Sequence, residues 1–245
     1  MLSDETVEEF WREGYIVVRG LVDRGSVAAV LEAGKRFAPP EEGGGWSARV
    51  FEHAAPEKDR DLHQLLWHES VVGAVERILE SPPRIWYGMF AVVPARGGTG
   101  LPWHQDNQYT QILGGALNTF IALSEVTPER ANLWVAPRSH VNGRQPARPS
   151  DLYNGAHREA VVAPENGICL PTLQPGDACI FDRCTYHRSL KNETDQHRFA
   201  YAAQYLADNA RLAGTGKKDP LRMRARELAV SSLRPAARCT EMQAP

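Results

Sequence analysis

The pattern of hydrophobic residues changes at Arg84, and this change limits the possible folds more than any other feature of the chain. Before Arg84, apolar residues recur at helical spacing between capping residues and glycines. After it, short runs of β-branched and aromatic residues alternate with Gly, Pro and Asn. Helices followed by many short strands favour an antiparallel sheet structure with helices packed on one side. We therefore expect a mainly β fold with flanking helices and a double-stranded β-helix core, the jelly roll of cupin-like proteins.

The first third of the chain has the signals that begin and end helices. Ser3 can cap a first helix, acidic residues fill its first turn, and Gly14 ends it. The stretch "PPEEGGGWS" has the composition of a loop that is neither helix nor strand. The expected elements are helices over 3–14, 23–38 and 58–80 (the last as one or two helices), a short strand over 15–20 and a loop over 39–47.

Five later runs have the length and composition of strands and are separated by turn residues. They cover 84–94, 118–126, 132–140, 177–182 and 198–206. We find no internal repeat and no boundary between these runs. The sequence therefore predicts one domain over 1–245, with a helical part over about 1–83, a jelly-roll core over about 84–210, and a polar tail from about Ala213 that includes one short helix.

Charge and cysteine content exclude several classes of protein. The formal net charge is −2, so no basic surface indicates nucleic acid, and no uncharged apolar stretch is long enough to cross a membrane. The acidic, amphipathic start does not resemble a signal peptide, and we expect a cytoplasmic protein. The cysteines lack zinc-site spacing and are expected to be free thiols. They are Cys169, Cys179, Cys184 and Cys239.

The stretch "LPWHQDNQYT", residues 101–110, contains two residue types that bind metals. In an extended segment His104 and Asp106 lie on one face and Gln105 lies on the other. His187, which follows a strand-like run and precedes a turn-like "KN", can supply a third ligand. Two histidines and one carboxylate form the facial triad that suits non-haem Fe(II) and leaves coordination positions open. The pattern therefore indicates an iron site formed by His104, Asp106 and His187.

Other interpretations of these residues stay open on the residues alone. A His-x-Asp tripeptide also fits a hydrogen-bonded pair at an exposed strand end, and a single histidine is commonly structural. His63 and His68 are five residues apart in a helical stretch, a spacing that does not place them on one face. Asp182 is a second possible carboxylate, but nothing in the sequence aims it at His104.

The order of several motifs adds a family resemblance to this interpretation. From "EEFWREGYIVVRGLV" through "WHQD", "LWVAPRSH" and "LQPGDACIFD" to "HRSLKNETDQHRFA", the chain resembles the phytanoyl-CoA dioxygenase family of Fe(II)- and 2-oxoglutarate-dependent oxygenases. The resemblance implies Fe(II), 2-oxoglutarate and O₂ as cofactor and cosubstrates. It implies the same three iron ligands, and it assigns Arg198 and Ser189 to the far carboxylate of 2-oxoglutarate. A planar guanidinium fits a carboxylate better than an ammonium does.

Spacing also bears on Ser189 and Arg198. If the turn "KNETDQ" joined two adjacent antiparallel strands, these residues would lie side by side. Without the resemblance, a surface arginine paired with Glu193 or Asp195 is the favoured interpretation of Arg198.

Four further residues receive weaker assignments from the resemblance. Arg49 corresponds to a second basic residue that can reach the cosubstrate, and Gln105, Trp103 and Thr119 are expected to line the pocket. Arg138 departs from the family, whose members commonly have a glycine at this position, where a tight turn is possible.

The resemblance implies oxidation of an unactivated C–H bond in a small molecule, by hydroxylation or by desaturation, cyclisation or epimerisation. Bacterial secondary metabolism, including antibiotic biosynthesis, is the expected setting. Loops over 41–50 and 142–160 and the segment after residue 110 are expected to determine specificity, with Trp46, Trp86 and Tyr109 as a wall for a ring-bearing substrate. Two alternatives stay open: a non-catalytic, ligand-sensing jelly-roll protein, and an enzyme that uses another divalent metal. The sequence does not indicate an oligomeric state.

Overall fold

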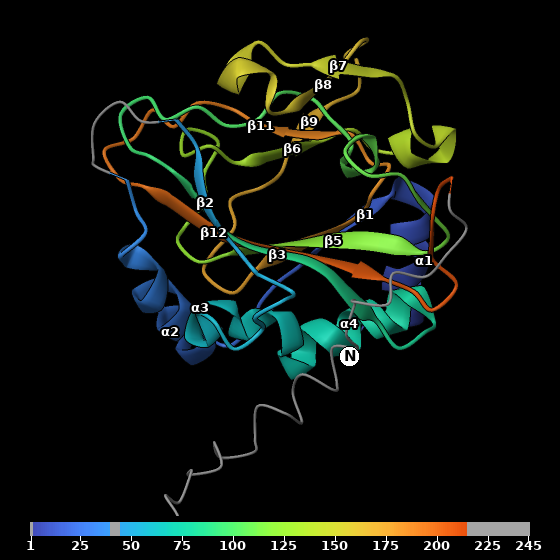
Figure 1. Ribbon diagram of the computed structural model, residues 1–245, viewed down its shortest axis with the longest axis horizontal. Helices are drawn as coiled ribbons and strands as arrows, with labels where there is room; N and C mark the ends of the chain where they lie inside the picture. Colours follow the sequence, from blue (N-terminus) through green and yellow to red (C-terminus); the bar gives the residue numbers. More distant parts are fainter. Residues whose placement is uncertain (1, 40–44, 215–245) are drawn as a thin grey trace, which may run out of the picture.

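A six-stranded antiparallel sheet forms the centre of the computed structural model, which describes residues 2–39 and 45–214 (Figure 1). Its strand order is β1-β10-β5-β12-β3-β2, so strands far apart in the sequence lie next to one another. The strands are β1 (Tyr15–Val18), β2 (Ser47–Val50), β3 (Arg84–Val93), β5 (Ala116–Ala122), β10 (Ala178–Asp182) and β12 (Arg198–Leu206).

A smaller sheet packs against one face of the large sheet. It has the order β11-β6-β9, formed by β11 (His187–Ser189), β6 (Leu133–Val135) and β9 (Ile168–Cys169). A buried apolar cluster that includes Phe120, Phe181 and Val135 fills part of the space between the sheets. Two strand pairs complete the β structure: β4 (Ile112–Leu113) with β13 (Arg211–Leu212), and β7 (Ala147–Pro149) with β8 (Arg158–Ala160). Two facing antiparallel sheets form the expected double-stranded β-helix.

Helices cover the opposite face of the large sheet, as Figure 1 shows. They are α1 (Asp4–Glu13), α2 (Arg24–Lys35), α3 (Arg60–His63) and α4 (Glu69–Leu79), with the 3₁₀ helix η1 (Gln64–Trp67) between the last two. Three other 3₁₀ helices lie in loops: η2 (Asp106–Gln108), η3 (Ser139–Asn142) and η4 (Leu152–Gly155). Fully buried side chains such as Phe10 and Val30 join these helices to the sheet, and each contributes about 1.5–3 kcal/mol of apolar burial.

The expected helix boundaries are confirmed at the N-terminus. The Ser3 hydroxyl accepts a hydrogen bond from the Thr6 amide at 3.2 Å, and Gly14 ends α1 with a φ of 81°. Asp23 caps α2 in the same way, through a bond from the Ser26 amide at 2.9 Å. No helix of the described residues is long and apolar enough to cross a membrane.

The predicted extent of the loop over 39–47 is partly wrong. Ser47, assigned to a loop, begins β2, which pairs with β3 from Ser47 opposite Val92 to Val50 opposite Met89. The sequence "SARV" contains only one large apolar residue, so it carries no alternation from which a strand can be predicted. The strand β2 forms because the free edge of β3 supplies hydrogen-bonding partners for its backbone. The expected tail helix and Cys239 lie outside the described residues.

Alternation along β12 determines what enters the space between the sheets. Tyr201 and Tyr205 lie on the helix-covered face and belong to its core. Arg198, Ala202 and Gln204 lie on the other face and line a cavity there. The helices therefore stabilise one face of the sheet, while the other face is left to carry polar groups.

Candidate metal centre

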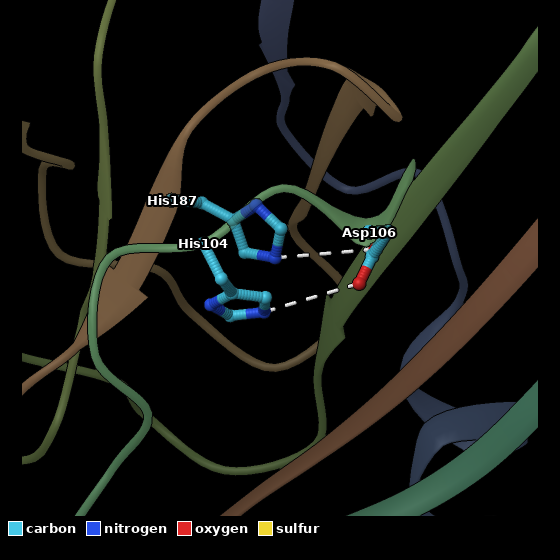
Figure 2. Close-up of side chains that lie close together, drawn as sticks. All are labelled: His104, Asp106 and His187. Carbon is cyan, nitrogen blue, oxygen red and sulfur yellow. Dashed lines mark ion pairs between the residues drawn. The ribbon is translucent and has the colours of Figure 1, made fainter. Parts of the chain in front are cut away.

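The side chains of His104, Asp106 and His187 converge on one point between the two sheets (Figure 2). The Nε2 atom of His104 lies 3.9 Å from Oδ1 of Asp106, and Nε2 of His187 lies 3.9 Å from Oδ2 of the same carboxylate. All three ligand atoms lie within 4.8 Å of one another. This cluster is the one group of three or more potential metal ligands among the described residues.

The backbone around residue 104 joins the two histidines directly. The amide of each histidine donates to the carbonyl of the other at 3.0 Å, which forms an isolated antiparallel bridge between segments more than eighty residues apart. Gln105 is extended, with φ −116° and ψ 140°, and Asp106 begins the 3₁₀ helix η2. His104 and Asp106 therefore face the same side, as the extended pattern predicts.

The protonation of both imidazoles suits metal binding. Nδ1 of His104 lies 2.7 Å from the Pro102 carbonyl, and Nδ1 of His187 lies 3.0 Å from the Thr185 carbonyl. A carbonyl only accepts hydrogen bonds, so each Nδ1 carries a proton, and each Nε2 faces Asp106. Burial, with the nearby His187 as a second cause, lowers the pKa of His104 from 6.5 to about 3, which keeps it neutral. Two imidazole Nε2 atoms and one carboxylate fit Fe(II).

A cavity of about 100 Å³ extends from this triad to Arg198. Arg198 is only 3% exposed, and its guanidinium carbon lies 5.4 Å from the centre of the Phe120 ring. This burial excludes the interpretation of Arg198 as a surface arginine paired with Glu193 or Asp195. Ser189 and Thr119 also line the cavity, so the triad, a guanidinium and two hydroxyl residues share one cavity.

The prediction that Ser189 and Arg198 lie on neighbouring strands is wrong. Ser189 belongs to β11 in the small sheet, and Arg198 belongs to β12 in the large one. The connecting turn does not form a hairpin, because the Asn192 amide nitrogen donates to the Gly98 carbonyl at 2.8 Å and the Asn192 side chain donates to the Val93 carbonyl at 3.3 Å. Ser189 and Arg198 therefore line the same cavity from opposite sheets.

Three expected pocket residues lie elsewhere. Gln105 is fully buried and bonds Gly143 and Gln145 at 2.9 and 2.7 Å, on the side opposite the cavity. Trp103 packs against the guanidinium of Arg188, whose carbon lies 4.7 Å from the ring centre. The remaining one, Arg49, forms an ion pair with Asp59 at 2.6 Å. None of these three lines the cavity of the described residues, whereas Thr119 does.

Several cavity residues were not expected from the sequence. The Gln204 amide donates to Oδ2 of Asp106 at 3.1 Å, and the Phe181 ring lies 4.6 Å from the His187 ring. Asn118 is 3% exposed, and its Oδ1 atom has no hydrogen-bond partner among the described residues. A buried amide without a partner is costly, and in this cavity it can bind a polar ligand. No local pattern marks these residues, because only the strand register places them beside the triad.

Aromatic rings lie next to the triad. The Tyr109 ring lies 5.8 Å from the His104 ring, edge to face, and the Trp46 ring lies 5.3 Å from the ring of His157. The Tyr109 hydroxyl accepts a hydrogen bond from the Arg158 amide at 3.1 Å, which ties the expected specificity loop to the site. Trp86 does not contribute, because it packs against a separate cluster that contains Ile112 and Leu206.

A family model described as phytanoyl-CoA dioxygenase (PhyH) matches residues 10–200, which include every residue of the triad. The chain belongs to the phytanoyl-CoA dioxygenase family. Two curated relatives are named phytanoyl-CoA dioxygenase domain-containing protein 1. The protein from Mus musculus is 26% identical over 71% of this chain and 61% of its own length, and the protein from Rattus norvegicus is 27% identical over 69% and 60%. The matched region spans about 60% of the length of these relatives.

Solved structures share the fold of this family member. EvdO2 from Micromonospora carbonacea var. aurantiaca, complexed with 2-oxoglutarate, superposes with a TM-score of 0.73 at 22% identity, over 90% of this chain and 96% of that one. The epimerase SnoN, complexed with Fe³⁺, alpha ketoglutarate and nogalamycin RO, superposes with a TM-score of 0.68 at 21% identity, over 88% and 91%. These likenesses confirm the expected fold class.

Proposed function

We propose that this protein is an Fe(II)- and 2-oxoglutarate-dependent oxygenase that oxidises an unactivated C–H bond of a small molecule. The main observation that supports the proposal is that the facial triad and the buried Arg198 line the same cavity. His104, Asp106 and His187 would hold the iron. When bound, iron would use O₂ and 2-oxoglutarate to supply an oxidant for the C–H bond; one oxygen atom would oxidise the cosubstrate to succinate and CO₂, and the other would serve the oxidation of the substrate.

The cavity residues suit the binding of 2-oxoglutarate. Arg198 is a buried cation with a planar fork of donors, and Ser189 brings a hydroxyl from the opposite sheet. A carboxylate between them would accept hydrogen bonds from both groups. Asn118 provides an amide oxygen that has no hydrogen-bond partner in the described part of the chain, and a rotation about its last side-chain bond would present either a donor or an acceptor to the ligand. Phe120 and Phe181 exclude water from the space between these polar groups.

The rings beside the triad support a ring-bearing substrate. Trp46 lines the cavity, and Tyr109 contacts the His104 ring and bonds the 157–158 segment. Aromatic rings bury large apolar surfaces and stack against other rings. SnoN, a structural neighbour, was crystallised with nogalamycin RO. We infer a small-molecule intermediate of bacterial secondary metabolism as the substrate, with hydroxylation, cyclisation, epimerisation or desaturation as the outcome.

The proposal is tested with anaerobically purified protein. We expect Fe(II) and 2-oxoglutarate together to produce a visible charge-transfer band, and exposure to air to produce succinate. Asp106→Gly should lose both the band and the succinate, because the site then has two ligands. His140→Gln is the matched control, since it changes a histidine whose ring bonds the Trp11 carbonyl outside the cavity.

Three results would contradict the proposal. A wild-type protein that gives neither band nor succinate with a library of ring-bearing compounds favours a ligand-sensing protein. Full turnover by Asp106→Gly removes Asp106 from the set of ligands. A protein that turns over with Mn(II) and not with Fe(II) instead identifies another metal as the cofactor.

A further inference from the structure

Two polar side chains, the half-buried Gln204 and the buried Arg183, lie behind Asp106 and have no part in the ligand set described above. Gln204 lies on the cavity face of β12, and Arg183 follows the end of β10 and is 2% exposed. Both are costly to bury, because an amide and a guanidinium lose their water. Their side-chain hydrogen bonds reach Asp106 and the segment that follows it.

The first branch of this arrangement reaches the Asp106 carboxylate through Gln204. Nη1 of Arg183 donates to Oε1 of Gln204, and Nε2 of Gln204 donates to Oδ2 of Asp106 at 3.1 Å. A guanidinium has no acceptor, so the amide oxygen must face Arg183 and the amide NH₂ group must face Asp106. Arg183 therefore determines which way the Gln204 amide points.

The second branch holds the main chain of the same segment. Nη2 of Arg183 donates to the carbonyls of Asp106 and Thr110 at 3.0 and 3.2 Å. The Asn107 amide in turn donates to the Arg183 carbonyl at 3.1 Å. One guanidinium thus holds the backbone of η2 directly and the Asp106 side chain through Gln204.

We propose that Arg183 and Gln204 are positioning residues, a clamp that sets the orientation of the Asp106 carboxylate toward the metal. This inference rests on the proposed function, since it takes the triad to be a metal centre. A free carboxylate can rotate about its last bond and offer either oxygen. With Oδ2 held by the amide, Oδ1 keeps its lone pairs for the cation. The carboxylate is already fixed before the metal binds, so metal binding does not cost the entropy of that rotation.

Cobalt binding to the metal-free full chain tests the clamp without any turnover. Gln204→Met keeps the length of the side chain and removes the donor, and Gln204→Asn keeps an amide that is one methylene too short to bridge Arg183 and Asp106. We expect both variants to bind Co(II) about 10–100-fold more weakly than the wild type in calorimetric titrations. We also expect the visible Co(II) spectrum to change, because the carboxylate is free to rotate.

The matched control is Gln64→Met. The Gln64 amide donates to the Asp61 carbonyl at 2.9 Å in the helical part of the chain, away from the cavity. Each protein is titrated below the temperature at which it begins to unfold. A change in global stability then does not alter the measured dissociation constant. Gln64→Met should bind Co(II) as tightly as the wild type and with the same spectrum.

The outcomes separate this inference from the proposed function. If the wild type binds Co(II) and both Gln204 variants bind it equally well, the clamp is refuted and the metal centre stands. If the wild type binds no Co(II), the metal centre and the clamp both fail. Weaker binding by both variants, with an unchanged control, supports the clamp.

Discussion

Replacing His63 with glutamine should make the stability of the protein less dependent on pH. His63 is 1% exposed at the end of α3, where its Nδ1 atom lies 2.7 Å from the Tyr201 hydroxyl and its ring lies 5.7 Å from the Phe51 ring. Burial is the largest cause that lowers the pKa of His63 from 6.5 to about 4, and the Asp59 carboxylate opposes this shift only in part. The folded protein therefore disfavours the charged imidazole.

The size of the effect follows from the two pKa values. Between about pH 4 and 6.5 the unfolded chain carries the His63 proton and the folded chain does not. The free energy of unfolding therefore falls by about 1.4 kcal/mol for each pH unit of acidification across this window, on account of this one group. The full loss is about 3 kcal/mol at the acid end. Above 6.5 both states carry the neutral ring, and the contribution to stability is fully present.

Urea unfolding of the metal-free protein at a series of pH values between about 4.5 and 6.5 measures this slope. A chelator in the buffer removes the contribution of metal binding at His104 and His187. We expect His63→Gln to lower the slope by about 1.4 kcal/mol per pH unit, since glutamine does not titrate and can still bond Tyr201. His68→Gln, which changes a half-buried histidine five residues further on, is the control. An unchanged slope in His63→Gln would refute the assignment of a buried neutral imidazole.

Three other predictions follow from single contacts. Arg138 has a φ of 62°, in the left-handed region, so Arg138→Gly should raise the free energy of unfolding by about 1 kcal/mol in urea titrations. A methyl group at Gly34 would overlap the Phe90 ring, so Gly34→Ala should lower the free energy of unfolding by about 1–3 kcal/mol in the same assay. If Arg198 holds the cosubstrate, Arg198→Lys keeps the charge but loses the fork of donors, and the dissociation constant for 2-oxoglutarate should rise about 30-fold in calorimetry; unchanged binding would contradict that role.

Local patterns were enough to predict much of the secondary structure. Ser3 and Gly14 mark the ends of the first helix because a cap depends only on a few neighbouring residues, and the structure confirms them. The strand over 198–206 was predicted with its observed bounds. The triad was also recognisable, since His104 and Asp106 are two residues apart and the order of motifs along the chain indicated His187.

The residues that surround the triad could not be predicted from local sequence patterns. Ser189 and Arg198 were expected on neighbouring strands, but β11 and β12 lie in different sheets. Gln105 is next to both predicted ligands in sequence and faces away from the cavity, whereas Gln204 is about a hundred residues away and bonds Asp106.

The sequence by itself determined the caps of the first helix, most strands of the large sheet and the three ligand types, because each depends on neighbours a few residues apart. The tertiary structure alone decided which polar residues surround the ligands. The register of strand pairing decides which face of the large sheet each side chain of a strand occupies. A shift of one residue would turn Gln204, Asn118 and Arg198 to the helix-covered face. The packing of the helices on one face, and of the small sheet on the other, selects that register.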